Sequence, residues 1–240
     1  MKYPKEIFVK DYFEVHDYYS KIYGKNKTII LMQVGSFHEC YCVDKKKGLN
    51  LIKLAAELDV SCPLKNGKKQ ISESNPRMLG FPIYVVNNFI EKLCNLNFTV
   101  VLIDQVTKPP KPKREVTGIY SPATLIPSNN TYSVSKSTFL TSIVIDFNKK
   151  NNISLFVIGL TSYDLTTGYG YFYESYSKPD DIMLALDESL RFLEAYPTRE
   201  IIIYFNEKLD RKINDLSYQD ILSYLNISNK NIFKMNKIKI

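Results

Sequence analysis

The pattern of apolar and polar positions predicts an α/β unit in the first half of the chain. The apolar run at 28–34 predicts a buried strand, and the run at 98–103 predicts a second one. Two groups of apolar residues recur at helical spacing between them: Leu51, Leu54, Ala55 and Leu58, then Phe89, Ile90, Leu93 and Leu96. Pro82 marks the start of the second helix, and the polar residues 64–76 predict a loop. The order strand, helix, helix, strand is typical of an α/β fold.

The pattern after this unit predicts a break and then a second sheet. Residues 107–115 (TKPPKPKRE) contain three prolines, which favour an extended, polyproline-like segment. Three consecutive strands are predicted at 139–147, 154–161 and 169–173. A helix that starts near Pro179 follows, and the fully apolar residues 200–205 predict a strand that lies parallel inside the sheet. Three antiparallel strands, a helix and a parallel strand are the order of a ribonuclease-H-like fold.

These patterns predict two domains. We expect a mixed-sheet α/β domain at 1–115, a linker at 116–136 and a ribonuclease-H-like domain at 137–240. The 240 residues, of which 45% are hydrophobic, are enough to build sizeable cores. The chain has no apolar stretch long enough to span a bilayer, and its first ten residues lack the apolar segment of a secretory signal. We therefore expect neither a membrane partner nor secretion.

Cysteine and histidine are too sparse to predict a metal site. The chain has four cysteines, none of them in a Cys-x-x-Cys pair, and two histidines, His16 and His38. This inventory argues against structural zinc. Free thiols in a reducing, intracellular compartment are the simplest interpretation, without distinguishing a nucleus, an organelle or a viral factory.

The net charge of +7 lies entirely in the first half of the chain. Residues 1–115 hold 19 basic and 12 acidic residues, whereas residues 116–240 hold 13 of each. A polyanionic partner is therefore expected to meet the first half. Lys108, Lys111, Lys113 and Arg114 add a basic stripe within 107–115, which fits either phosphate contact or a solvated, charged linker.

The apolar run at 28–34 is followed by Gly35-Ser36-Phe37-His38-Glu39, which is unusual in a basic protein. Phe37 and Glu39 are two residues apart, so in an extended chain they share one face. An aromatic wedge between base steps costs a few kcal/mol, and stacking on a base returns about 1–3 kcal/mol, so the balance favours weak or mismatched pairs. Glu39 could then bond an edge of the displaced base. Taken alone, the pair is too short to be specific and is better explained by a core aromatic and a solvated acid.

A set of ordered blocks resembles the amino-terminal part of MutS-type mismatch-repair proteins. The blocks are, in order, 34–39 (VGSFHE), 78–82 (MLGFP) with 86–89 (VNNF), 101–106 (VLIDQV), 114–117 (REVT) with 121–125 (SPATL), and 164–168 (DLTTG). The first resembles the family's Gly-(Asp/Ser)-Phe-Tyr-Glu mismatch-recognition motif. The chain departs from the pattern where His38 replaces Tyr and Asp104 replaces Glu, where Pro76 lies earlier than the family's proline, and where extra residues precede the second helix.

The resemblance implies a mismatch-recognition domain, followed by a ribonuclease-H-like connector domain. It implies that Phe37 enters mismatched or looped double-stranded DNA from the minor groove, that Glu39 bonds the displaced base, and that Gly35, Ser36 and His38 complete the motif. It further implies a full-length homodimer that binds downstream repair proteins and hydrolyses ATP with Mg through later domains. The present chain has no Gly-x-x-x-x-Gly-Lys-(Ser/Thr) phosphate loop, so for it we expect no cofactor and no ATPase activity.

Two other functions compete with DNA mismatch recognition. A ribonuclease-H-like fold can hold a metal-dependent nuclease, for which Asp146, Asp164, Asp187 and Glu188 are the candidate carboxylates. Asp164, however, is better explained as a turn residue before Thr-Thr-Gly. Alternatively, the chain is a protein-interaction module only.

Overall fold

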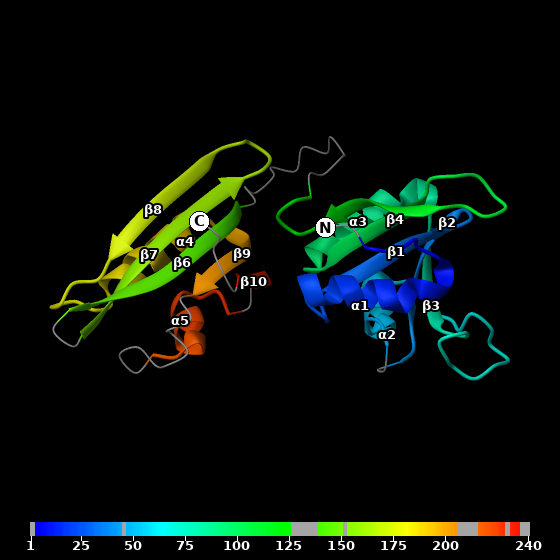
Figure 1. Cartoon of the computed structure of the whole chain (residues 1–240), viewed down its shortest axis with the longest axis horizontal. Coiled ribbons are helices and arrows are strands. Elements are labelled where there is room, and N and C mark those ends of the chain that lie inside the picture. The colour runs from blue at the N-terminus through cyan, green and yellow to red at the C-terminus, as the bar shows by residue number, and fades with distance from the viewer. Residues whose placement is uncertain are drawn as a thin grey trace. The chain divides into compact units, whose positions relative to one another are not determined.

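The computed structural model describes residues 3–44, 47–125, 139–150, 153–205, 216–228 and 231–235 (Figure 1). The chain divides into unit 1, Met1–Leu125, and unit 2, Ile126–Ile240. In the part of the chain that the structure describes, no helix combines the length and the hydrophobicity that crossing a bilayer requires.

Unit 1 is a five-stranded mixed sheet with helices on it. Its elements are η1 (Val9–Asp11), α1 (Tyr12–Tyr23), β1 (Thr28–Val34), β2 (Phe37–Cys42), α2 (Leu51–Leu58), β3 (Arg77–Pro82), η2 (Ile83–Val85), α3 (Val86–Asn95), β4 (Thr99–Gln105) and β5 (Arg114–Tyr120). The strand order is β3-β2-β1-β4-β5, in which β1 and β4 are parallel and the other neighbours are antiparallel. Strand β1 and the two helices predicted at Leu51–Leu58 and after Pro82 are confirmed, and β4 extends slightly further than predicted.

The two faces of this sheet carry different helices. Tyr12, at the start of α1, packs edge-on against Tyr41 of β2, with ring centroids 4.8 Å apart. Phe89 of α3 stacks on Phe81 of β3, at 4.1 Å. Tyr41 and Phe81 lie on opposite faces, because Phe81 pairs with His38 and successive strand residues alternate in direction. The first turn of α1 therefore lies over the Tyr41 end of β2.

The predicted break at 107–115 is wrong in its position. Arg114 and Glu115 begin β5, which pairs with β4 over Arg114–Tyr120. Residues 106–113 are the loop of this hairpin, closed by the Val106 N–H that donates to the carbonyl of Lys113 at 2.9 Å. The linker predicted at 116–136 thus starts too early, since residues 116–125 belong to unit 1. Residues 126–136 lie outside the described part of the chain.

The predicted three antiparallel strands, helix and parallel strand of unit 2 are confirmed in that order, and the structure adds a parallel strand at Asn231–Met235 that the sequence patterns did not predict. Its elements are β6 (Phe139–Lys150), β7 (Ile153–Asp164), β8 (Gly170–Tyr176), α4 (Leu184–Ala195), β9 (Thr198–Phe205), α5 (Tyr218–Tyr224) and β10 (Asn231–Met235). The sheet order is β10-β9-β6-β7-β8. Strands β6, β7 and β8 are antiparallel neighbours, whereas β9 runs parallel to β6 and β10 parallel to β9. Pro179 lies in a turn, and α4 begins five residues after it.

Candidate nucleic-acid interface

A two-residue turn carries the chain from β1 into β2. Val34 pairs with Phe37, which leaves Gly35 and Ser36 as the turn. Gly35 has φ +63°, and a positive φ at the first turn position is typical of type II′ hairpins, where glycine is preferred. The carbonyl of Ser36 accepts the backbone N–H of Ile83 at 3.1 Å. Gly35 and Ser36 therefore shape the turn and tie it to η2, directly after β3, which fixes the position of Phe37 at the start of β2.

Phe37 and Glu39 lie together on the face of β2 that α1 leaves open at this end. Phe37 is 43% exposed, which is unusual for a phenylalanine on a strand. Gly80 of β3 pairs with Glu39, and a β-carbon placed on Gly80 would lie 3.7 Å from the Phe37 ring and 3.8 Å from Cγ of Glu39. The missing side chain at Gly80 thus leaves space between the aromatic ring and the carboxylate.

That space opens into a surface hollow of about 470 Å³. Its lining residues are Phe37, Glu39, Val60, Ser61, Pro63, Met78 and Gly80. Glu39 is the only carboxylate among them, and within the hollow it is surrounded by apolar and small side chains. The hollow therefore offers one charged hydrogen-bond acceptor beside one exposed aromatic ring.

His38, in contrast, lies on the opposite face of the sheet. Its side chain is only 2% exposed, and its Nε2 lies 2.6 Å from Oδ1 of Asp104 on β4. The hydroxyl of Thr117 donates to the other oxygen of Asp104. The structure therefore does not bring the His38 side chain together with Phe37 and Glu39. It brings together two residues at which this chain departs from the family pattern, His38 and Asp104.

The predicted basic stripe lies on the loop between β4 and β5 and at the start of β5. Lys108, Lys111 and Lys113 are exposed. The loop leaves the sheet next to the β1–β2 turn, because the backbone N–H of Gln105 donates to Oε1 of Gln33 at 2.8 Å. Lys108, Lys111 and Lys113 are thus free to meet phosphates at the same end of the sheet as Phe37.

Arg114 plays a different part from these lysines. Its Nε donates to the backbone carbonyl of Gln33 at 2.9 Å. Partial burial lowers the pKa of Arg114, although a guanidinium stays charged at neutral pH. Arg114 therefore fastens β5 to the end of β1.

The structure adds a second basic loop that the sequence patterns did not single out. Lys65, Lys68 and Lys69 lie in the loop at 64–76, which is ordered by the buried side chain of Asn75. The amide of Asn75 donates to the carbonyls of Asn66, Lys69 and Gln70 at 3.0–3.1 Å and accepts from the N–H of Asn66 at 2.7 Å. The cluster of lysines is visible in the sequence, but the side of the molecule on which it projects is not.

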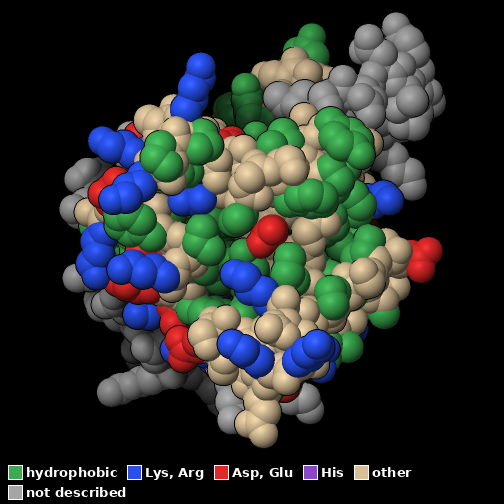
Figure 2. Space-filling model, turned by 90° about the vertical axis from the view of Figure 1, so that its right-hand side faces the viewer, with side chains coloured by type: hydrophobic (Ala, Val, Ile, Leu, Met, Phe, Trp, Pro, Cys, Tyr) green, Lys and Arg blue, Asp and Glu red, His purple; other side chains and the backbone are tan. Residues whose placement is uncertain are grey.

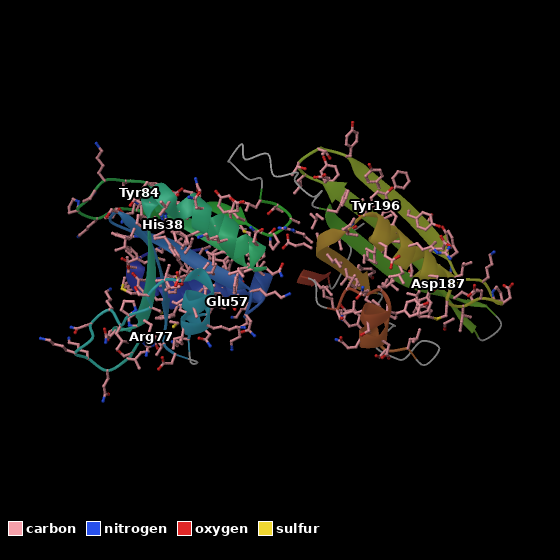
Figure 3. All side chains as sticks on the ribbon, turned by 180° about the vertical axis from the view of Figure 1, so that it is seen from behind. His38, Glu57, Arg77, Tyr84, Asp187 and Tyr196 are labelled. Carbon is pink, nitrogen blue, oxygen red and sulfur yellow. The ribbon has the colours of Figure 1, made fainter. Side chains whose placement is uncertain are left out.

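Both basic loops project from one side of unit 1, as Figures 1 and 3 show, and Figure 2 faces that side. Hydrophobic side chains are spread across the middle of this surface, where basic and acidic side chains also lie, and further lysine and arginine side chains lie along its left and lower margins (Figure 2). Tyr84, 88% exposed, lies on the same side (Figure 3). It follows Pro82 by two residues, and Pro82 pairs with Phe37. Tyr84 is therefore a second exposed aromatic ring, two residues beyond the β3 partner of Phe37.

The four candidate carboxylates of unit 2 have separate hydrogen-bond partners. Asp146 accepts the backbone N–H of Phe147 at 2.7 Å. Asp164 accepts the N–H and the hydroxyl of Thr166 at 2.8 and 2.6 Å, as expected for a turn residue. Glu188 accepts from Arg191 at 2.6 Å, and Asp187 accepts from the hydroxyl of Tyr224. Among the described residues no group of three His, Cys, Asp or Glu side chains is arranged to hold a metal ion.

Comparison with known proteins shows which family the chain resembles. The family model described as MutS domain I matches residues 13–129. A mimivirus protein, named as a DNA mismatch repair mutS homolog of Acanthamoeba polyphaga mimivirus, is 30% identical over 231 residues, covering 93% of the chain and 20% of that protein. The DNA mismatch repair protein MutS of Rickettsia prowazekii is 30% identical over 132 residues, covering 51% of the chain and 14% of that protein.

A third relative extends over both units. The DNA mismatch repair protein MutS of Petrotoga mobilis is 24% identical over 228 residues, covering 92% of the chain. The chain spans between 14% and 24% of the length of these three relatives. The chain therefore belongs to the MutS family, and its unit 1 carries the family's domain I.

Proposed function

We propose that unit 1 recognises mismatched or looped double-stranded DNA, with Phe37 entering from the minor groove and Glu39 bonding the displaced base. The observation that carries the proposal is the pairing of an exposed Phe37 with Glu39 across the side-chain-free Gly80. A stacking surface and a hydrogen-bond acceptor for one base are thereby offered in one hollow. Fluorescence anisotropy with matched and mismatched duplexes, on the protein that carries this chain, tests it through the ratio of the two affinities.

The energetics favour a damaged site over a sound one. Unstacking a base step costs a few kcal/mol, whereas stacking on an aromatic side chain returns about 1–3 kcal/mol per base. The cost is smaller where the pair is already mismatched. On intact DNA, inserting Phe37 gives no net gain in binding free energy. The preference for a mismatched duplex therefore depends on how easily the base stack opens at the mismatch.

The two basic loops would supply affinity without sequence preference. The logarithm of the binding constant falls as the logarithm of the salt concentration rises. Replacing Lys68 and Lys69, or Lys108 and Lys111, by alanine should make this slope shallower by roughly 0.9 for each phosphate that is no longer neutralised. The decrease should be equal on matched and mismatched duplexes, because phosphates carry no mismatch information. Binding isotherms measured between low and physiological salt give both slopes.

The matched control for these lysines is Lys53→Ala. Lys53 lies on α2, where it pairs with Glu57 at 3.7 Å (Figure 3 labels Glu57). This variant should keep the parental slope. If both double variants kept the parental slope, the two loops would not contact DNA phosphates.

Glu39→Gln should change which mismatches are preferred rather than abolish DNA binding. The amide keeps the size of the side chain, but it removes the negative charge and turns one acceptor oxygen into a donor. Bases that present a donor to Glu39 should lose affinity relative to bases that present an acceptor. A panel of all base mismatches measured in parallel gives the order of preference, and an unchanged order would remove Glu39 from base contact.

Several properties of the whole protein go with this proposal. We infer that unit 2 is the connector domain, that the full-length protein is a dimer, and that domains beyond this chain bind ATP with Mg and hydrolyse it. The exposed aromatic side chains of the edge strand β8, among them Phe172 at 87%, favour a role in protein interaction for unit 2. If interaction were the only role of the chain, the anisotropy assay would find no dependence on the mismatch.

A further inference from the structure

We propose that Tyr41 is a positioning residue for Glu39, whose hydroxyl holds one carboxylate oxygen so that the other is presented to the base. The inference rests on the proposed function, because it concerns how Glu39 performs base contact. It adds a residue outside the Gly-Ser-Phe-His-Glu motif to the specificity of the site.

The geometry begins with the alternation of β2. Tyr41 follows Glu39 by two residues, so the two side chains share a face, and the Tyr41 hydroxyl donates to Oε2 of Glu39. In the part of the chain that the structure describes, no group donates a hydrogen bond to Oε1 of Glu39. Glu39 also lines the hollow, so Oε1 is the oxygen left for a ligand.

Tyr41 is itself held firmly, unlike the carboxylate that it contacts. Its side chain is 3% exposed, and its ring packs at 82° against that of Tyr12. The hydroxyl of Tyr12 donates to the carbonyl of Ile30 at 3.1 Å, which fixes Tyr12 to β1. On the outer side, the ammonium of Lys65 lies 5.7 Å from the centre of the Tyr41 ring. The Tyr41 hydroxyl is therefore a fixed point on the edge of the core.

The chemistry makes Tyr41 a permanent donor. Burial raises the pKa of Tyr41 well above its ordinary value, and the hydrogen bond to Glu39 raises it further. The phenol thus keeps its proton at any physiological pH. A hydrogen bond to an ionised carboxylate is stronger than one between neutral groups, so it can select one orientation of the Glu39 side chain.

Pre-ordering Glu39 matters because its flexible side chain is partly exposed. Glutamate loses considerable rotamer freedom when a ligand immobilises it, and a side chain already held in its bound orientation avoids that loss. Packing against Tyr12 would be served equally by phenylalanine, so packing alone does not explain the hydroxyl at position 41.

The test is Tyr41→Phe in the protein that carries this chain, with matched and mismatched duplexes measured by anisotropy. The ratio of mismatched to matched affinity should fall about tenfold, whereas affinity for matched duplex should stay at the parental value. Combining Tyr41→Phe with Glu39→Gln should give little further loss, because both changes act on one contact. Replacing Tyr41 by 4-aminophenylalanine, which keeps a donor, should restore the ratio.

The matched control is Tyr173→Phe in unit 2. The hydroxyl of Tyr173 also donates to a glutamate, Oε2 of Glu188 at 3.0 Å, so the same oxygen is removed from the same kind of contact. This variant should keep the parental ratio. A parental ratio in Tyr41→Phe, equal losses on both duplexes, or additive effects with Glu39→Gln would each overturn the positioning role.

Failure of the proposed function would look different. In that case the parent protein itself would show no preference for the mismatched duplex, and the positioning role would fall with it. A parent with clear preference and a Tyr41→Phe variant with the same preference would overturn the role of Tyr41 alone.

Discussion

Phe37→Ala is expected to abolish the preference for a mismatched duplex and to leave weak, salt-dependent binding to any duplex. The stacking contribution of an aromatic side chain is about 1–3 kcal/mol per base, which corresponds to roughly 5- to 150-fold in affinity for the mismatched site. Matched DNA gains nothing from the ring, because opening a sound stack consumes what stacking returns. The affinity for matched duplex should therefore change little.

The folded state should tolerate this change, so a loss of mismatch preference would not be due to unfolding. Phe37 is 43% exposed and stands at the first position of β2, so its removal opens no enclosed cavity. Phe172→Ala, which removes another exposed phenylalanine from unit 2, is the matched control and should keep the parental preference. Equal mismatch affinity in Phe37→Ala and the parent would contradict the wedge.

Contacts between residues that are close in the sequence could be predicted from it, whereas contacts between distant residues could not. The shared face of Phe37 and Glu39 follows from the two-residue period of a strand, and the structure confirms it. The same period places His38 on the other face, but the motif resemblance had grouped it with its neighbours. Its contact with Asp104 joins residues 66 positions apart, which no local pattern reveals.

Among the strands that the sequence patterns missed, β3 and β5 form because they pair with neighbouring strands. Strand β3 contains Gly80, and β5 begins in a segment rich in proline and lysine, so neither shows a strong apolar run. Both are stabilised by neighbours in the sheet, because strand preference depends largely on context. The space beside Glu39 exists only because β3 brings Gly80 opposite to it, and this required the register of the two strands.

Gly48→Ala is expected to destabilise unit 1 more than any of the other substitutions. Gly48 has φ +78°, a left-handed conformation that costs other residues roughly 1–2 kcal/mol. A β-carbon there would lie 2.5 Å from the backbone carbonyl oxygen of Tyr41 and 3.2 Å from Cα of Cys42. Both are backbone atoms of β2, so relief would require moving the strand that carries Phe37 and Glu39. We expect a total decrease of about 2–4 kcal/mol in the free energy of unfolding.

Thermal and urea denaturation of the chain measure this decrease, followed by a probe that reports on unit 1. Gly67→Ala is the matched control, because Gly67 has no atom within 4 Å of a built β-carbon and its φ is not positive. It should leave the free energy of unfolding within about 0.5 kcal/mol of the parent. Parental stability in Gly48→Ala would mean that β2 can yield at Tyr41. Tyr41 and Glu39 lie on the same strand. A strand that can move at Tyr41 would not hold the Glu39 carboxylate in a fixed position.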